Sequence, residues 1–90
     1  SDVEVLSDHP LSNKIDIICQ KKGINFYINV FTAHKTINEK NKNAELNKSL
    51  EKFSDLSKSV DFDHKRYIFR QLFVKIKNGR SLITFNKNIF

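Results

Sequence analysis

The chain has 90 residues, which suffice for one domain but not for two. Eight Phe and two Tyr, against only two Gly and one Pro, indicate a chain that folds around a modest core and exclude a disordered or loop-built protein. Its 16 basic and 10 acidic residues give a formal net charge of +6, and no run approaches the roughly 20 apolar residues of a membrane helix, so no membrane partner is expected.

The first residues carry no clear strand or helix pattern. Asp8-His9-Pro10, followed by Ser12-Asn13, is typical of a turn, because Pro restricts the residue before it and Ser and Asn bond to the local backbone. Since the chain starts without Met, we expect residues 1–13 to be a lead-in that continues from an upstream segment. Residues 14–90 are then expected to form a single globular domain.

Residues 14–31 give the clearest local pattern. Apolar residues alternate on both sides of Lys22-Gly23, and Gly23 supplies the positive φ that a tight turn needs. Folding the chain at this point sets apolar residues opposite one another, in the pairs Cys19–Phe26, Ile17–Ile28 and Ile15–Val30. The pattern predicts an antiparallel hairpin that packs this apolar face on the core.

A polar stretch over residues 32–43 precedes a helical pattern. Apolar residues recur at intervals of four, three, three and four, at Leu46, Leu50, Phe53, Leu56 and Val60. Residues at these intervals lie on one face of a helix, so we predict a helix over about residues 43–59. Thr36 followed by Glu39 has the spacing of a capping box, which would move the start of the helix towards Thr36.

The last third of the chain fits two interpretations. As a hairpin, apolar residues face one another across an Asn78-Gly79 turn, namely Leu72, Val74, Ile76, Ile83 and Phe85. As a helix, another apolar set forms a stripe that ends before Gly79, namely Phe62, Phe69, Leu72, Phe73 and Ile76. We favour the helix, followed by a short strand over residues 81–85. Either interpretation gives the α+β class, with a small antiparallel β-sheet and one or two helices packed on one face.

No group of residues has the spacing that catalysis or metal binding needs. His9, His34 and His64 are far apart in the chain, and two glycines cannot build a phosphate-binding loop. A hairpin of a metal-dependent nuclease would follow an Asp such as Asp16 with Glu-x-Lys on its second strand, where this chain reads Asn29-Val30-Phe31. We therefore expect no enzyme activity, no cofactor and no metal site. The one Cys, within an apolar segment, indicates a reducing, intracellular compartment.

A protein-interaction head is the first of two binding hypotheses. Apolar side chains also stand on the hairpin face that looks away from the predicted core, and a partner would cover them unless the chain's own ends do. We expect a partner interface at Ile18, Tyr27, Phe31 and Phe69, with a second protein subunit in a hetero-oligomer. A charged residue at Tyr27 or Phe31 should then weaken binding more than it destabilises the fold.

A small nucleic-acid-binding module is the second hypothesis. A basic patch would supply the phosphate contacts that such a module needs, with aromatic residues nearby for base stacking. We predict this patch at Lys21, Lys22, Lys75, Lys77 and Arg80. No sequence motif of a known RNA- or DNA-binding domain accompanies these residues, so this hypothesis is the alternative.

Parts of the chain resemble the Spc subunits of the outer-kinetochore rod complex. The resemblance rests on the hairpin 14–31, on Leu50-Glu51-Lys52-Phe53 and on the run from Asp61 to Phe73. It implies an RWD-like head at the end of a coiled coil, with the last of these runs in a C-terminal helical part. It also implies a nuclear protein whose head pairs with a second Spc head at the centromere-facing end of the rod. There it would receive helical docking peptides and serve chromosome segregation.

Overall fold

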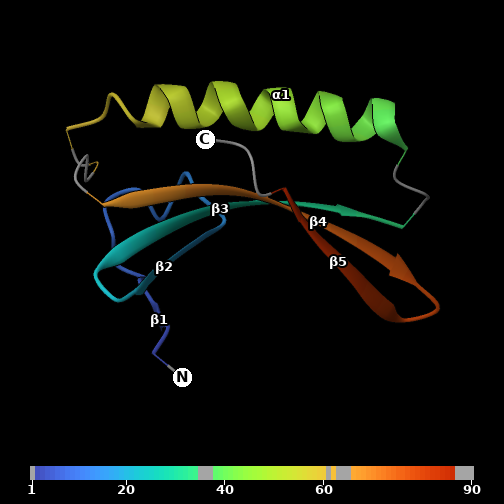
Figure 1. Ribbon diagram of the computed structural model, residues 1–90, viewed down its shortest axis with the longest axis horizontal. Helices are drawn as coiled ribbons and strands as arrows, with labels where there is room; N and C mark the ends of the chain where they lie inside the picture. The colour runs from blue at the N-terminus through green and yellow to red at the C-terminus, as the bar shows by residue number, and fades with distance from the viewer. Residues whose placement is uncertain (1, 35–37, 61, 63–65, 87–90) are drawn as a thin grey trace.

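A five-stranded sheet and one long helix make up the two layers of the molecule (Figure 1). The computed structural model describes residues 2–34, 38–60, 62 and 66–86. In chain order the elements are β1 (Glu4–Val5), β2 (Ile17–Lys21), β3 (Ile24–Ala33), α1 (Glu39–Leu56), β4 (Tyr67–Lys77) and β5 (Arg80–Asn86). Neighbouring strands are antiparallel except β3 and β4, which run parallel. The predicted α+β class is confirmed.

The β2–β3 hairpin has the predicted register. The facing pairs include Cys19–Phe26 and Ile17–Ile28. A two-residue turn of Lys22 and Gly23, with φ of 53° and 74°, joins the strands, as the sequence pattern requires. The predicted pair of Ile15 with Val30 is wrong, because β2 begins only at Ile17. Asp16 Oδ2 accepts the Val30 amide at 2.7 Å instead, and Ile15 is buried in the core.

The hairpin packs on the core with the face opposite to the one predicted. Ile18 and Tyr27 are buried, whereas Cys19 and Phe26 on the other face are only half-buried. The alternation along a strand tells which side chains share a face, but not which face a helix will cover. A helix that connects two parallel neighbours crosses on one side of the sheet, since such connections are right-handed in nearly all proteins. That side depends on the pairing of β3 with β4, which residues 14–31 do not reveal.

α1 begins earlier than predicted. Its N-cap is Asn38, whose side-chain oxygen accepts a hydrogen bond from the Asn41 amide at 2.8 Å. Thr36, expected in a capping box, lies outside the described residues. The predicted apolar stripe faces the sheet at Leu46, Leu50, Phe53 and Leu56. The helix ends at Leu56, so the assignment of Val60 to the stripe is wrong, and Val60 is 97% exposed.

Residues 67–77 form strand β4, so the helix favoured for this region is wrong and the hairpin interpretation is confirmed. The turn is Asn78-Gly79, with both residues at positive φ. The facing pairs include Leu72–Phe85 and Val74–Ile83. β4 lies between β3 and β5 and carries apolar side chains on both faces, a pattern that periodicity alone does not separate from a buried helix. The resemblance to the Spc subunits had also implied a helix here.

The core lies between α1 and the sheet. Its buried members are Leu11, Ile15, Ile18, Tyr27, Phe53, Leu56, Phe62 and Phe69. Residues before 14 contribute to the domain, since Leu11 is buried and β1 pairs with β2 through Val5 and Cys19. Within the part of the chain that is described, no helix combines the length and the apolar character needed to cross a membrane.

Candidate protein-binding surface

Three of the four residues predicted to bind a partner are core residues. Ile18, Tyr27 and Phe69 are 3%, 0% and 1% exposed. Phe31, the fourth, is half-buried, and its ring centroid lies 6.2 Å from that of Phe73. Because the chain itself encloses Ile18, Tyr27 and Phe69, the predicted docking surface is wrong for these three residues.

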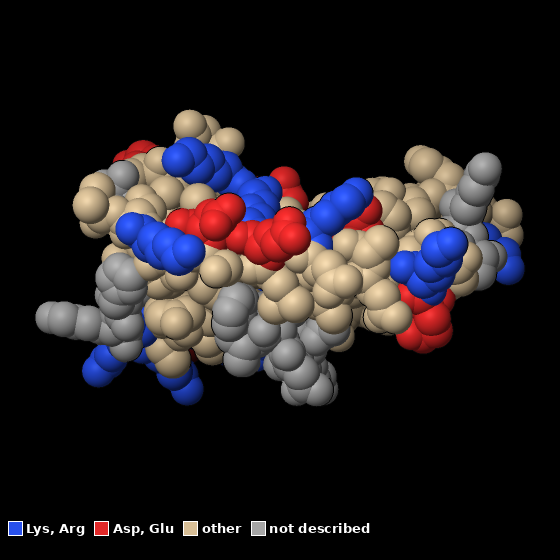
Figure 2. Space-filling model, turned by 90° about the horizontal axis from the view of Figure 1, so that it is seen from above, with Lys and Arg blue, Asp and Glu red and all other residues tan. Residues whose placement is uncertain are grey.

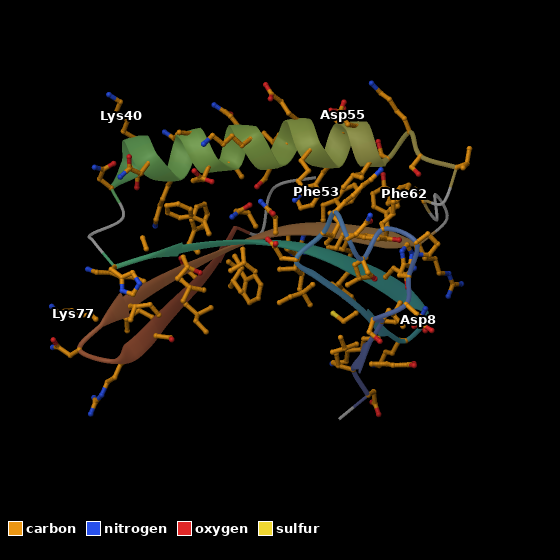
Figure 3. The ribbon with its side chains drawn as sticks, turned by 180° about the vertical axis from the view of Figure 1, so that it is seen from behind. Asp8, Lys40, Phe53, Asp55, Phe62 and Lys77 are labelled. Atoms are coloured by element: carbon orange, nitrogen blue, oxygen red, sulfur yellow. The ribbon has the colours of Figure 1, made fainter. Side chains whose placement is uncertain are left out.

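Aromatic rings fill the space between α1 and the sheet. Phe53 of α1 stacks on Phe69 of β4 with ring centroids 4.4 Å apart, and Phe62 stacks on Phe69 at 5.3 Å. Figure 3 shows Phe53 and Phe62 on the side of the helix that faces the sheet. The Tyr27 ring contacts Phe62 and Phe69, and its hydroxyl lies 3.4 Å from His9 Nε2. Asn25 Nδ2 lies 3.5 Å from the same hydroxyl, so Tyr27 has polar neighbours for its hydroxyl beside the aromatic rings.

A polar network that we did not predict joins α1 to the two central strands. Ser49 of α1 and Gln71 of β4 are fully buried and hydrogen-bonded through Ser49 Oγ and Gln71 Oε1. Asn29 Nδ2 of β3 donates to both, at 2.8 Å to Ser49 and 3.1 Å to Gln71, and Lys52 Nζ donates to Asn29 Oδ1 at 3.3 Å. Because these groups satisfy one another inside the fold, the network holds the helix in place and offers no ligand site.

The sheet face turned away from α1, here called the open face, is apolar. The strand pairings place on it Val5, Ile17, Cys19, Phe26, Ile28, Val30, Ile68, Leu72, Val74, Ile76, Ile83 and Phe85. Val5, Ile83 and Phe85 are more than half exposed. In Figure 1, α1 lies on the other side of the sheet, and no described helix covers the open face. This face is the one that the sequence pattern had assigned to the core.

A hollow of about 460 Å³ lies in the open face. Its lining comes from all five strands or their flanks, at Val3, Cys19, Lys21, Phe26, Ile28, Arg70 and Phe85. In Figure 1, β1 and β5 both lie farther from α1 than the middle of the sheet does, so the open face is concave. Hollows of roughly 300–1,000 Å³ with mostly apolar walls and a few polar groups are typical of binding sites. Lys21 and Arg70 are the polar groups of this one.

Cys19 lies in the hollow and is a half-buried thiol. Burial raises the pKa of the Cys19 thiol above its ordinary value, because a thiolate would lose part of its hydration there. The thiolate is the reactive form, so the raised pKa lowers the nucleophilicity of Cys19 at neutral pH.

We expect iodoacetamide to alkylate Cys19 more slowly in the folded chain than in the urea-unfolded chain near neutral pH. As the pH rises, the alkylation rate of the folded chain should level off at a higher pH than that of the unfolded chain, since only the folded state raises the pKa. Mass spectrometry over a pH series measures both rates, with Cys19→Ser as the blank. Identical pH profiles for the two states would contradict the burial of this thiol.

The five basic residues predicted to form one patch are divided between the two ends of the sheet. Lys21 and Lys22 lie at the β2–β3 turn, whereas Lys75, Lys77 and Arg80 lie at the β4–β5 turn. Because β3 runs parallel to β4, its ten residues separate the two groups by about 30 Å. Seen from above, basic and acidic side chains are interspersed over α1, so the helix adds no surface of a single charge (Figure 2). The single basic patch is therefore wrong, and the nucleic-acid hypothesis loses its main support.

Carboxylates and histidines do not gather into a metal site within residues 2–34, 38–60, 62 and 66–86. Asp16, which stands where a nuclease hairpin would hold its first metal ligand, instead accepts the Val30 backbone amide. Asn29, at the position of the second ligand, belongs to the buried polar network. His64 lies outside the described residues.

Comparison with known proteins assigns the chain to no family. Neither protein-family models, nor curated proteins, nor solved structures gave a match. The class of the domain therefore rests on its fold alone. The chain is a small α+β domain whose sheet has one face covered by α1 and one apolar, concave face that no described element covers.

Proposed function

We propose that this domain is a non-catalytic protein-interaction head that pairs with a second protein subunit through its open face. The observation that carries the proposal is the apolar surface on the side of the sheet away from α1. The central strands β3 and β4 carry apolar side chains on both faces, as strands that are covered on both sides do, whereas strands with one face in water alternate apolar and polar residues. Apolar surface that a partner removes from water contributes about 25 cal/mol per Å² to binding before the costs of association.

The size of the open face suits such a partner. The strands have 2, 5, 10, 11 and 7 residues. At about 3.3 Å per residue and about 4.8 Å between strands, they give a face on the order of 550 Å². That is near the upper end of the apolar patches of about 300–600 Å² that monomeric proteins expose. It also approaches the roughly 800 Å² that each partner contributes to a stable protein–protein interface.

The cellular setting that we propose follows from the resemblance to the Spc subunits. The hairpin supports it, because the resemblance rests on two strand runs around the Gly23 turn, and β2 and β3 are such strands. Strand β4 does not support it, because the resemblance implied a helix over these residues. In this setting the head would pair with a second Spc-type subunit at the centromere-facing end of a kinetochore rod, in the nucleus, with helical peptides as further partners.

Substitution of Phe85 by Asn is expected to reduce binding of the partner subunit at least tenfold, because Phe85 lines the hollow and is 51% exposed. The matched control is Leu82→Asn, since Leu82 lies on the same strand, is 55% exposed and points to the opposite face. Affinity purification of the tagged protein from its own cells, with quantitative mass spectrometry, identifies proteins lost with Phe85→Asn and kept with Leu82→Asn. Titration of the purified pair then gives the change in affinity.

Both variants should melt within a few degrees of the unchanged chain, because neither side chain is buried. A partner whose affinity falls equally with Phe85→Asn and Leu82→Asn would show that the open face is not the interface. Salt-sensitive binding of RNA or DNA that both variants retain would favour the nucleic-acid alternative.

A further inference from the structure

Arg70 stands among apolar side chains of the open face. It lies on β4 between Ile68 and Leu72 of the same face, and it is half-buried before any partner binds. Within the described part of the chain, its guanidinium donates one hydrogen bond, from Nη1 to the Phe69 carbonyl at 3.1 Å. A guanidinium carries five N–H donors. A partner that covers Arg70 must therefore supply acceptors for it, because a buried charge without a partner is strongly destabilising.

Lys21 adds a second positive charge to the same hollow. Lys21 and Arg70 are the charged residues of the lining, and no acid accompanies them there. A second copy of this chain, docked face to face, would bring these cations towards one another in a setting that excludes water. A partner with carboxylates would pair with them, and a carboxylate matches the planar fork of an Arg with two hydrogen bonds. The charge of the hollow thus favours a different, acidic partner over a second copy.

The shape of the open face also limits what can lie on it. The five strands span about 19 Å between the outermost strand axes, at roughly 4.8 Å per strand. One α-helix with its side chains is about 10–12 Å wide, which fits a hollow lined from all strands. A helix already covers the other face of the same sheet, since α1 packs there through Leu46, Leu50 and Phe53.

We infer that the occupant of the open face is an amphipathic α-helix of the partner subunit, with an apolar stripe that packs on Phe26, Ile28 and Phe85 and an acidic side chain that pairs with Arg70. This inference rests on the proposed function and adds the chemistry of the partner. Lys21 attracts the same acidic side of the helix. The apolar contacts of the partner helix provide the affinity. The pairing of its acidic side chain with Arg70 selects acidic helices over basic ones.

The test uses two synthetic helical peptides with the same leucine stripe, which carry either Glu or Lys at the positions that flank the stripe. Fluorescence anisotropy measures their affinities for the whole chain at physiological salt. The Glu peptide should bind at least tenfold more tightly than the Lys peptide, and Arg70→Glu should reverse the preference. Arg80→Glu changes the net charge by the same amount at the far end of the sheet, and it should leave the preference as it is.

The remaining outcomes separate the two proposals. If both peptides bind equally, Arg70→Glu changes neither affinity and Phe85→Asn weakens both, the acidic helix is wrong and the open face remains the interface. If neither peptide binds, the inferred helix is wrong. The proposed function fails only if Phe85→Asn and Leu82→Asn affect binding of the partner subunit equally. Sedimentation of the chain alone provides a further check, because a stable dimer that Phe85→Asn dissociates would mean that a second copy occupies the face.

Discussion

Substitution of Tyr27 by Glu is expected to unfold the domain. Tyr27 is fully enclosed, and its ring contacts Phe62 and Phe69. Its hydroxyl lies near His9 Nε2 and Asn25 Nδ2, at 3.4 and 3.5 Å. A carboxylate placed there without a full set of partners costs several kcal/mol. Small domains have a total stability of only about 5–15 kcal/mol. Circular dichroism at room temperature should show loss of the native signal, and urea titration should show no cooperative transition.

Val60→Glu is the control for Tyr27→Glu, because Val60 is almost fully exposed and its change should alter stability by no more than about 0.5 kcal/mol. The sequence pattern had predicted the opposite behaviour for Tyr27, with loss of binding and an intact fold. A Tyr27→Glu chain that melts like the unchanged one but no longer binds its partner would restore that interpretation and exclude the open face as the interface.

Phe53→Ala has the second largest expected effect. Phe53 is the main aromatic contact of α1 with the sheet, stacked on Phe69 and fully buried. Loss of such a ring removes its burial and leaves a cavity, which costs about 3–5 kcal/mol. Urea denaturation followed by circular dichroism gives the change in free energy of unfolding.

Phe85→Ala is the comparison for Phe53→Ala, because it also removes a phenyl ring, but from the open face. Phe85 is half exposed, so the loss of stability should be well below that of Phe53→Ala. Equal losses would mean that the open face is covered in the isolated chain as thoroughly as the core beneath α1.

Local patterns predicted the pairing of neighbouring strands better than they predicted the faces of the sheet. The pairing of Ile17 with Ile28 follows from the alternation of apolar and polar residues and from the turn at Gly23. These two signals lie within a few residues of one another in the sequence. The alternation is the same whichever face becomes the core, so it placed Tyr27 outside and Cys19 inside. The sequence pattern favours a helix for β4 because a strand with apolar residues on both faces lacks the alternation that identifies a strand with one face in water.

The candidate site was missed because its parts are far apart in the sequence. The hollow combines Val3, Phe26, Arg70 and Phe85, which meet only after β4 inserts beside β3. The buried polar network left a weak signal. Ser49 interrupts the apolar face of α1 and directly precedes Leu50. Gln71 lies on β4 between Phe69 and Phe73, on the same face as both. A single polar residue at a core position indicates a buried hydrogen bond only once its partner is known.

The hydrogen bonds among Asn29, Ser49 and Gln71 fix the position of α1 along the sheet. A slide of the helix by one turn, about 5.4 Å, would move the Phe53 ring off Phe69. Such a slide would carry Ser49 away from Gln71 and leave buried amide groups without partners, at a cost of about 1–3 kcal/mol for each. The network and the aromatic contacts together therefore fix the position of α1 along β3 and β4. A partner that binds the open face as proposed would meet strands that α1 already holds from the other side, so little of its binding energy would go into ordering them.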